Sequence, residues 1–210
     1  MPVDPTLTVE LDLFTQGAHI LIGVDEVGRG AMAGPVMVGV CALTAAVTEF
    51  PAGLRDSKLI SEKKRLRLEP QLREWATVAV GEASPQEIDQ WGISACLGLA
   101  GKRALANLHA SGIDVGRATI LLDGSFDWLN PALSSKLPVI TRVKADQDCA
   151  VVSAASVIAK VTRDALMAEL ASAHPVYEWA SNKGYGSANH MAAIAEHGVT
   201  SLHRVSWVKS

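Results

Sequence analysis

Cysteine is scarce in this chain of 210 residues: only three are present, Cys41, Cys96 and Cys149. Their number is odd, they lie far apart, and no Cys-x-x-Cys pair occurs, which argues against a disulfide framework or a zinc site. Free cysteines are usually buried and behave as small apolar side chains. We therefore expect three reduced, buried thiols and a cytoplasmic protein, because disulfides are rare in that reducing compartment.

A hydrophobic run long enough to cross a membrane is also missing. The longest weakly polar stretch, GPVMVGVCALTAAV at 34–47, is shorter than the ~20 residues that a membrane span needs. The first 19 residues are acidic and lack the basic and apolar regions of a secretory signal. This pattern indicates a soluble protein without a membrane partner, and its 49% of hydrophobic residues are ample for one sizeable core.

Common catalytic motifs are absent as well. The chain contains no GxSxG, GxxxxGK[ST] or HExxH, and GRGAMAG at 28–34 does not match the dinucleotide-binding GxGxxG. No template for a serine hydrolase, a P-loop enzyme, a zinc peptidase or a dinucleotide-binding enzyme is therefore present.

Positive charge is in slight deficit overall, with a formal net charge of −3, which argues weakly against a general nucleic-acid binder. Residues 55–67, RDSKLISEKKRLR, are an exception, because six cations stand against two acids there and leave a local charge of +4. This basic segment is equally typical of a solvated helix face and of a patch that faces phosphates.

Alternation and length predict five strands, at 19–27, 35–43, 75–83, 118–124 and 138–146. Ser84, Pro85 and Glu87 form a capping-box pattern that predicts a helical region reaching Leu108. Two further helices are expected over 148–171 and 188–197. The order indicates an α/β fold, a mixed five-stranded sheet flanked by helices with its first three strands antiparallel. We expect a catalytic domain over 1–170 and a small C-terminal helical extension over 171–210.

Carboxylates stand at the ends of three of the predicted strands: Asp25 and Glu26, Asp123, and Asp146. If those ends share one edge of the sheet, four acids converge and repel one another unless cations lie between them. Hard oxygen ligands favour Mg²⁺ or Mn²⁺, and two such ions can activate water and stabilise the leaving oxygen of a phosphodiester. Taken singly, Asp123 is also typical of a turn and Asp146 of a helix cap.

Six motifs in order give the chain a resemblance to a known family. DEVGRG (25–30), DSK (56–58), LLDG (121–124), KAD (144–146), SAASVIAKVTRD (153–164) and KGYGS (183–187), followed by His190, resemble bacterial type 2 ribonuclease H, ribonuclease HII. The resemblance spans residues 20–207 and implies an RNase H-like fold. It also implies hydrolysis of the RNA strand of RNA–DNA hybrids and incision 5′ of ribonucleotides embedded in duplex DNA, leaving 3′-hydroxyl and 5′-phosphate ends.

The resemblance also assigns roles to residues. Asp25, Glu26, Asp123 and Asp146 match the acids that hold two Mn²⁺ or Mg²⁺ ions. Gly28, Arg29 and Gly30 match the segment whose backbone approaches the 2′-hydroxyl, Lys58 matches a phosphate-binding lysine, and Tyr185 matches the tyrosine that packs on the deoxyribose after the ribonucleotide.

Alternatives remain beside this hypothesis. A DNA integrase or resolvase would use similar acids, and a catalytically silent module would bind hybrids without cutting them. The late segment GVTSLHRVSWVKS (198–210) departs from the family pattern at Val205 and Trp207, which leaves the contacts of the C-terminal part open.

We expect a monomer, because the sequence shows no signal of an interface. Because adjacent strand residues face opposite sides, we also expect the backbone to leave regular strand geometry near Glu26.

Overall fold

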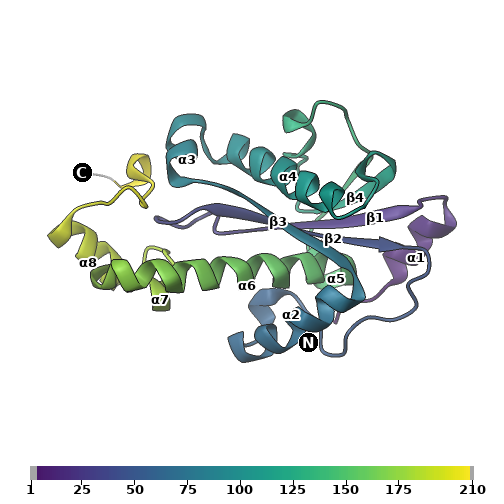
Figure 1. Cartoon of the computed structure of the whole chain (residues 1–210), viewed down its shortest axis with the longest axis horizontal. Helices are drawn as coiled ribbons and strands as arrows, with labels where there is room; N and C mark the ends of the chain where they lie inside the picture. The colour runs from purple at the N-terminus through teal and green to yellow at the C-terminus, as the bar shows by residue number, and fades with distance from the viewer. Residues whose placement is uncertain (1–3, 209–210) are drawn as a thin grey trace.

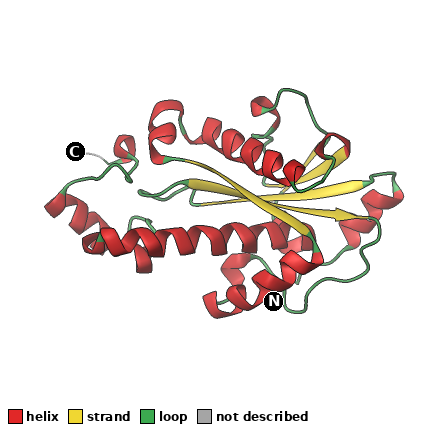
Figure 2. Cartoon of the chain, in the orientation of Figure 1, coloured by secondary structure: helices red, strands yellow, loops and turns green. Residues whose placement is uncertain are grey.

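The computed structural model describes residues 4–208, which form a central five-stranded sheet between two layers of helices (Figures 1 and 2). The strands have the order β3-β2-β1-β4-β5, in which β1–β2 and β2–β3 are antiparallel while β1–β4 and β4–β5 are parallel. They span β1 Ile20–Val27, β2 Val36–Thr44, β3 Thr77–Ala83, β4 Ala118–Asp123 and β5 Val139–Arg142. The predicted mixed sheet with three antiparallel strands is confirmed.

Helices cover both faces of the sheet. The α-helices are α1 Thr8–Thr15, α2 Glu62–Trp75, α3 Pro85–Trp91, α4 Ile93–Ala110, α5 Ala145–Asp148, α6 Ala150–Ala173, α7 Trp179–Asn182 and α8 Ala188–His197. In Figure 1, α3 and α4 lie on one side of the sheet and α2 and α6 on the other. None of the helices within residues 4–208 combines the length and apolar character that crossing a membrane requires.

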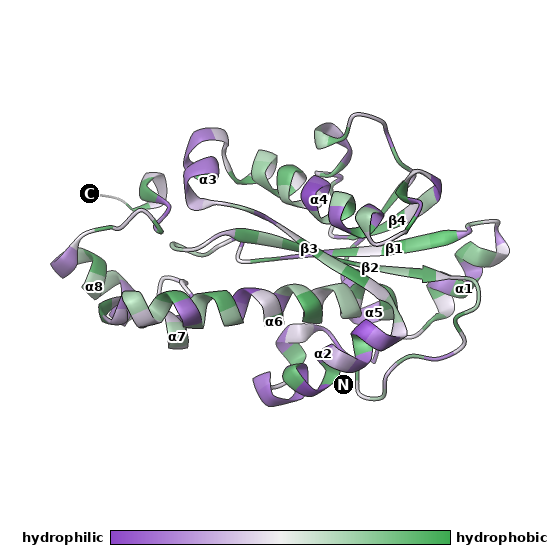
Figure 3. Cartoon of the chain, in the orientation of Figure 1, coloured by the Kyte–Doolittle hydropathy of each residue, from purple (hydrophilic) through white to green (hydrophobic). Residues whose placement is uncertain are grey.

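Three sequence predictions need correction or refinement. The capping box at Ser84 is present, but the helical region divides at Gly92, whose φ of +77° ends α3 before α4 begins. The fifth strand ends at Arg142 rather than reaching Asp146, which lies instead on the short helix α5. The basic segment contributes to the exposed helix α2, much of which is hydrophilic (Figure 3). The predicted boundary at residue 170 falls inside α6, so the division into two domains stays a prediction.

Side chains of β1 alternate between the two faces of the sheet, and each face has its own apolar cluster. Ile22 and Val24 pack with α4, and Leu21 packs with α6 on the opposite face. The α6 helix lies very close to the sheet, because a Cβ at Gly23 would come within 2.5 Å of the Val151 carbonyl oxygen. Close approach of this kind requires glycine on the strand and small residues on the first turns of the helix.

The N-terminal helix α1, which sequence reasoning missed, fixes the start of α6. The backbone N–H of Val151 donates to Glu10 Oε1 at 2.9 Å, and the amide of Ala150 donates to the Thr6 carbonyl at 3.1 Å. Within residues 4–208 the second carboxylate oxygen of Glu10 has no partner, and burial raises the pKa of this side chain. An acid contributed by a distant helix thus satisfies one of the free N–H groups with which every helix begins.

A third cluster lies where α6 extends beyond the sheet toward α7 and α8 (Figure 1). It contains a buried aromatic group in which the Trp179 indole donates to His190 Nε2 at 3.0 Å. The Thr200 backbone N–H donates to His203 Nδ1 at 2.9 Å, and the His190 ring contacts the Tyr185 carbonyl through Nδ1 at 2.8 Å. These hydrogen bonds are satisfied when both histidines are neutral. Burial, and to a lesser extent the adjacent His190, lowers the pKa of His203 from 6.5 to about 4.

Acidification is therefore expected to weaken the fold through His203. Below pH 6.5 His203 is protonated in the unfolded chain, whereas in the folded protein it stays neutral until about pH 4. The free energy of unfolding therefore decreases as the pH falls across that window. By this linkage the loss from about pH 8 to about pH 5 is ~2 kcal/mol. His203→Asn, which cannot be protonated, should show a correspondingly shallower pH dependence in urea unfolding. Equal pH dependence in both proteins would contradict this role.

Candidate active site

The four predicted acids gather at one end of the sheet. Because β1 and β4 run parallel, their carboxyl ends meet at the same edge, which places Asp25 and Glu26 near Asp123. Asp146 reaches the same place from α5, and its backbone N–H lies 3.4 Å from Asp123 Oδ1. Lys144, immediately before α5, adopts a left-handed conformation with φ of +61°, which turns the chain from β5 into α5.

The expected distortion of the strand at Glu26 is wrong. Pairing with β2 continues in register from Asp25 through Glu26 to Val27. Regular strand geometry therefore directs Asp25 toward α6, while Glu26 lines a cavity on the α4 side with Arg29 and Asp123.

Burial dominates the electrostatics of the β1 acids. Asp25 is only 3% exposed, and burial, followed by repulsion from Glu26, raises its pKa well above the usual range. Burial also raises the pKa of Glu26, against the opposing effect of Arg29, whose Nη1 lies 3.3 Å from Glu26 Oε1. In both cases burial outweighs the nearby cations, so the neutral form of each acid is favoured more than it is in water.

Asp146 shows the same excess of negative charge. Burial and then the charges of Asp123 and Asp56 raise its pKa to about 6. Lys58 Nζ lies 3.4 Å from Asp146 Oδ2. Burial alone would lower the pKa of Lys58, but Asp25, Asp56 and Asp146 outweigh that effect and raise it. Lys58 is thus held by the acid cluster, and it is presented by a short turn capped by the Asp56 side chain.

The acids suit a divalent cation in kind, since carboxylate oxygens are the ligands that Mg²⁺ and Mn²⁺ prefer. Their spacing is less complete: in the part of the chain that the structure describes, no three acidic, histidine or cysteine side chains are grouped so that they could hold a metal ion. Two of the acids are instead in ion pairs, Glu26 with Arg29 and Asp146 with Lys58. Ligation by all four acids would require both cations to be displaced.

A loop immediately after β1 brings together residues that the sequence places far apart. The backbone N–H of Gly28 donates to the Tyr185 hydroxyl at 3.2 Å across 157 positions of sequence. Gly28 has φ of +79°, and a Cβ there would overlap the Arg163 guanidinium. By contrast, nothing lies within 4 Å of the position that a Cβ would occupy at Gly30. Gly28 is therefore required by the fold, whereas Gly30 faces open space.

Several side chains beside this site were missed by sequence reasoning. Ser156 on α6 bonds to Ser57 at 2.8 Å and links the Lys58 turn to the helix that covers Asp25. Arg163 and Arg204 are completely buried beneath the loop after β1. Ser94, Phe126 and Trp128 complete the cavity of about 290 Å³ that Glu26, Arg29 and Asp123 line. Ser156 and Arg163 lie in the quoted motif at 153–164, and Arg204 lies in the late segment 198–210. No sequence signal pointed to Ser94, Phe126 or Trp128.

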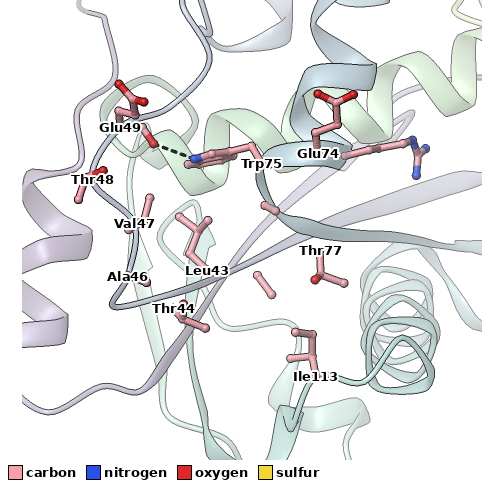
Figure 4. A pocket seen from close by; sticks show the side chains of 13 residues that line it. Leu43, Thr44, Ala46, Val47, Thr48, Glu49, Glu74, Trp75, Thr77 and Ile113 are labelled. Carbon is pink, nitrogen blue, oxygen red and sulfur yellow. Dashed lines mark hydrogen bonds between the residues drawn. The ribbon is translucent and has the colours of Figure 1, made fainter.

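A cavity of about 490 Å³ lies at the opposite end of the sheet (Figure 4). It is formed around the end of β2 and the start of β3, where the Trp75 indole donates to the Glu49 carbonyl at 2.7 Å. None of the four candidate acids reaches it.

Comparisons with known proteins agree with this arrangement. A family model described as Ribonuclease HII matches residues 22–210. The ribonuclease HII of Streptomyces avermitilis is 49% identical over 210 residues, which cover 99% of this chain and 85% of that protein. The ribonuclease HII of Anaplasma phagocytophilum is 39% identical over 194 residues, covering 92% and 88%.

Solved structures share the RNase H-like fold. The ribonuclease H2 of Pyrococcus horikoshii has a TM-score of 0.66 at 25% identity and covers 90% of this chain and 93% of its own. Bst-RNase HIII in complex with Mn²⁺ has a TM-score of 0.72 at 22% identity, covering 91% and 68%, which shows the fold alone. The chain therefore belongs to the ribonuclease HII family of ribonuclease H nucleases.

Proposed function

We propose that this protein is an endonuclease that hydrolyses the RNA strand of RNA–DNA hybrids and incises duplex DNA 5′ of embedded ribonucleotides, leaving 3′-hydroxyl and 5′-phosphate ends. The observation that carries the proposal is the position of the Gly28–Gly30 loop, closed by Tyr185, directly beside the acids that end β1. In this proposal the groups that would hydrolyse a phosphodiester and those that would recognise ribose belong to one site.

The catalytic groups in this proposal are Asp25, Glu26, Asp123 and Asp146. They would hold two Mn²⁺ or Mg²⁺ ions, which when bound activate a water and stabilise the departing 3′ oxygen. Burial first, and neighbouring carboxylates second, raise the pKa values of Asp25, Glu26 and Asp146, and bound cations would favour the charged form of each acid. Lys58 and Arg29, now paired with acids, would be free to contact phosphates once cations replace them.

Substrate recognition in this proposal depends on the 2′-hydroxyl, the group that distinguishes RNA from DNA at a given nucleotide. The open space at Gly30 lets a sugar approach the backbone, and the partly exposed Tyr185 ring, 37% accessible, can pack on the next deoxyribose. The hydroxyl is read here and takes no part in the attack.

We propose further that the protein acts in the cytoplasm, as a monomer and in the repair of ribonucleotides in DNA. Its three free cysteines are buried, in keeping with a reducing compartment.

Replacing one acid should abolish incision. Wild-type protein with Mn²⁺ or Mg²⁺ should cut a duplex that carries one ribonucleotide and spare the all-DNA duplex, whereas Asp146→Asn should lose at least ~100-fold in kcat/KM because a ligand is lost. Asp148→Asn, on the same short helix but paired with Arg142, is the matched control and should retain activity. An intact ribonucleotide substrate, or an Asp146→Asn protein as fast as wild type, would refute the assignment. Equal cutting of all-DNA duplex would favour an integrase-like nuclease, and binding without turnover a silent module.

Divalent cations should raise the melting temperature of the wild-type protein. Ligands that bind only the folded state stabilise it by mass action, and here they also relieve repulsion among the acids. Millimolar Mn²⁺ should therefore increase Tm, a chelator should reverse the increase, and Asp146→Asn should show less of it than Asp148→Asn. A Tm that is unchanged by Mn²⁺ would speak against a shared metal site.

Tyr185→Ala should reduce incision at single ribonucleotides more than cleavage of long hybrids, because only the former present a deoxyribose directly after the ribonucleotide. Tyr185→Phe keeps the ring but removes the hydroxyl that accepts from Gly28, so it separates packing from loop closure. Steady-state kcat/KM on both substrates measures the effect. Equal losses on the two substrates would remove the proposed role at the junction.

A further inference from the structure

Two buried arginines lie beneath the loop after β1 without an acidic partner. Arg163 and Arg204 are each 0% exposed, and within residues 4–208 neither forms an ion pair with a carboxylate. Burial lowers the pKa of both guanidinium groups, to about 10 for Arg204. An unpaired buried cation is costly unless its hydrogen bonds are satisfied, so the contacts of these side chains indicate what they do.

Arg204 donates only to backbone carbonyls of this loop. Its Nη2 lies 2.6 Å from the Gly28 oxygen and its Nη1 lies 2.8 Å from the Arg29 oxygen. The Gly34 oxygen accepts from Nη2 at 3.1 Å and from Nε at 3.3 Å. One planar guanidinium thus fixes three carbonyls, a geometry that the single ammonium of lysine cannot reproduce.

The direction of these carbonyls determines the direction of the neighbouring amides. In a planar trans peptide the C=O and N–H bonds point to opposite sides, and no cis peptide bond occurs in the described chain. Because the Gly28 and Arg29 oxygens point inward to Arg204, the N–H groups of Arg29 and Gly30 point away from it. Among the described residues neither amide has an acceptor, whereas the Gly28 amide donates to the Tyr185 hydroxyl.

Arg163 fixes the remainder of the loop and its partner segment. It donates to the Pro35 oxygen at 2.9 Å, the Ala33 oxygen at 3.0 Å and the Lys183 oxygen at 2.8 Å. Its guanidinium carbon lies 5.5 Å from the centre of the Tyr185 ring. The loop is therefore tied to the segment that carries Tyr185. Arg204 holds the carbonyls of the two peptides whose amides are free, and the Ala31 N–H is a second donor to the Gly28 oxygen at 3.2 Å.

The segment that carries Arg204 is itself fixed by contacts of Val205, Ser206 and Trp207. Asp89 on α3 accepts from the backbone N–H groups of Val205 at 2.9 Å and Ser206 at 3.1 Å. The guanidinium carbon of Arg204 lies 4.8 Å from the centre of the Trp207 ring. The segment whose sequence departs from the family pattern thus retains a defined contact with the loop.

We propose that Arg204 is a positioning residue that orients the amides of Arg29 and Gly30 as a pair of donors for the 2′-oxygen of the ribonucleotide. The inference rests on the proposed function and adds the residue that sets its selectivity. Loss of Arg204 should therefore impair discrimination of ribose from deoxyribose rather than affinity for duplex in general.

The test is the ratio of two affinities measured on one protein preparation, so that any inactive fraction cancels. In an Asp146→Asn background, which blocks cutting, dissociation constants are measured for a duplex with one ribonucleotide and for the all-DNA duplex of the same sequence. The parent should prefer the ribonucleotide by ~10-fold or more, since sites built on hydrogen bonds reject analogues that lack the partner group. Arg204→Lys should bring the ratio close to one with little change in all-DNA affinity. Arg103→Lys, which replaces an arginine that donates to the Glu82 carbonyl elsewhere, should retain the parent ratio.

A second measurement needs no change at Arg204 and decides the matter if Arg204→Lys does not fold. In ¹⁵N-labelled protein of the Asp146→Asn background, the amide resonances of Arg29 and Gly30 should shift with the ribonucleotide duplex and shift less with the all-DNA duplex. Identical shifts with both duplexes, or an unchanged affinity ratio in folded Arg204→Lys, would overturn the positioning role. Failure of the proposed function itself is distinguishable, because the parent would then show no preference and wild type would not cut.

Discussion

The close contact between α6 and the sheet is the constraint on which the rest of the structure depends. Backbone of α6 lies against Gly23 and Gly39, so near that a Cβ on either strand residue would collide with the helix. This contact excludes water from the inner face of β1 and leaves Asp25 almost wholly buried. The same helix presents Ser156 to the Lys58 turn and, farther along, Arg163 to the loop after β1. One rigid element therefore sets both the electrostatics of the acids and the position of the loop after β1.

Charge at the site is balanced in two different ways. The acids are partly neutralised by Arg29 and Lys58, which are exposed enough to leave, with side chains 56% and 69% accessible. The cations beneath the loop are completely buried and bound to peptide oxygens, which cannot leave. Exposed ion pairs contribute little stability and exchange partners easily, whereas buried charge held by several hydrogen bonds is fixed. The site therefore combines replaceable charges where metal and phosphate would bind with permanent charges where backbone direction matters.

Sequence reasoning succeeded where the determining interactions are local. The apolar runs identified all five strands within a few residues, and the Ser84 capping box identified the start of α3 because its two hydrogen bonds join residues three positions apart. The gathering of Asp25, Glu26 and Asp123 was expected on the condition that their strands end at one edge, and the parallel pairing of β1 with β4 meets that condition. Asp146 reached the same edge by a route that the pattern did not show, since a left-handed Lys144 converts the end of the expected strand into a helix.

What sequence reasoning missed depends on contacts between distant residues. Glu10 accepts from the Val151 amide at the start of α6, 141 positions away, and Arg204 donates to Gly28, 176 positions away. Neither pairing leaves a periodic signal in the sequence. The error at Glu26 has another cause: it assumed that two acids serving one site must point the same way. The structure keeps regular pairing through Glu26, so the acids flank the end of the strand from its two faces.

The two glycines of the Gly28–Gly30 segment show why a motif alone does not reveal its physics. Gly28 is required from within, because its positive φ and the Arg163 guanidinium leave no place for a side chain. Gly30 has neither constraint, because nothing lies within 4 Å of the position that a Cβ would occupy. A glycine that the fold does not need, beside an amide with no acceptor, is best explained by a ligand that must come close. The first glycine is therefore fixed by the interior, whereas the second borders open space. Between them the Arg29 side chain is exposed, while its carbonyl is bound by Arg204.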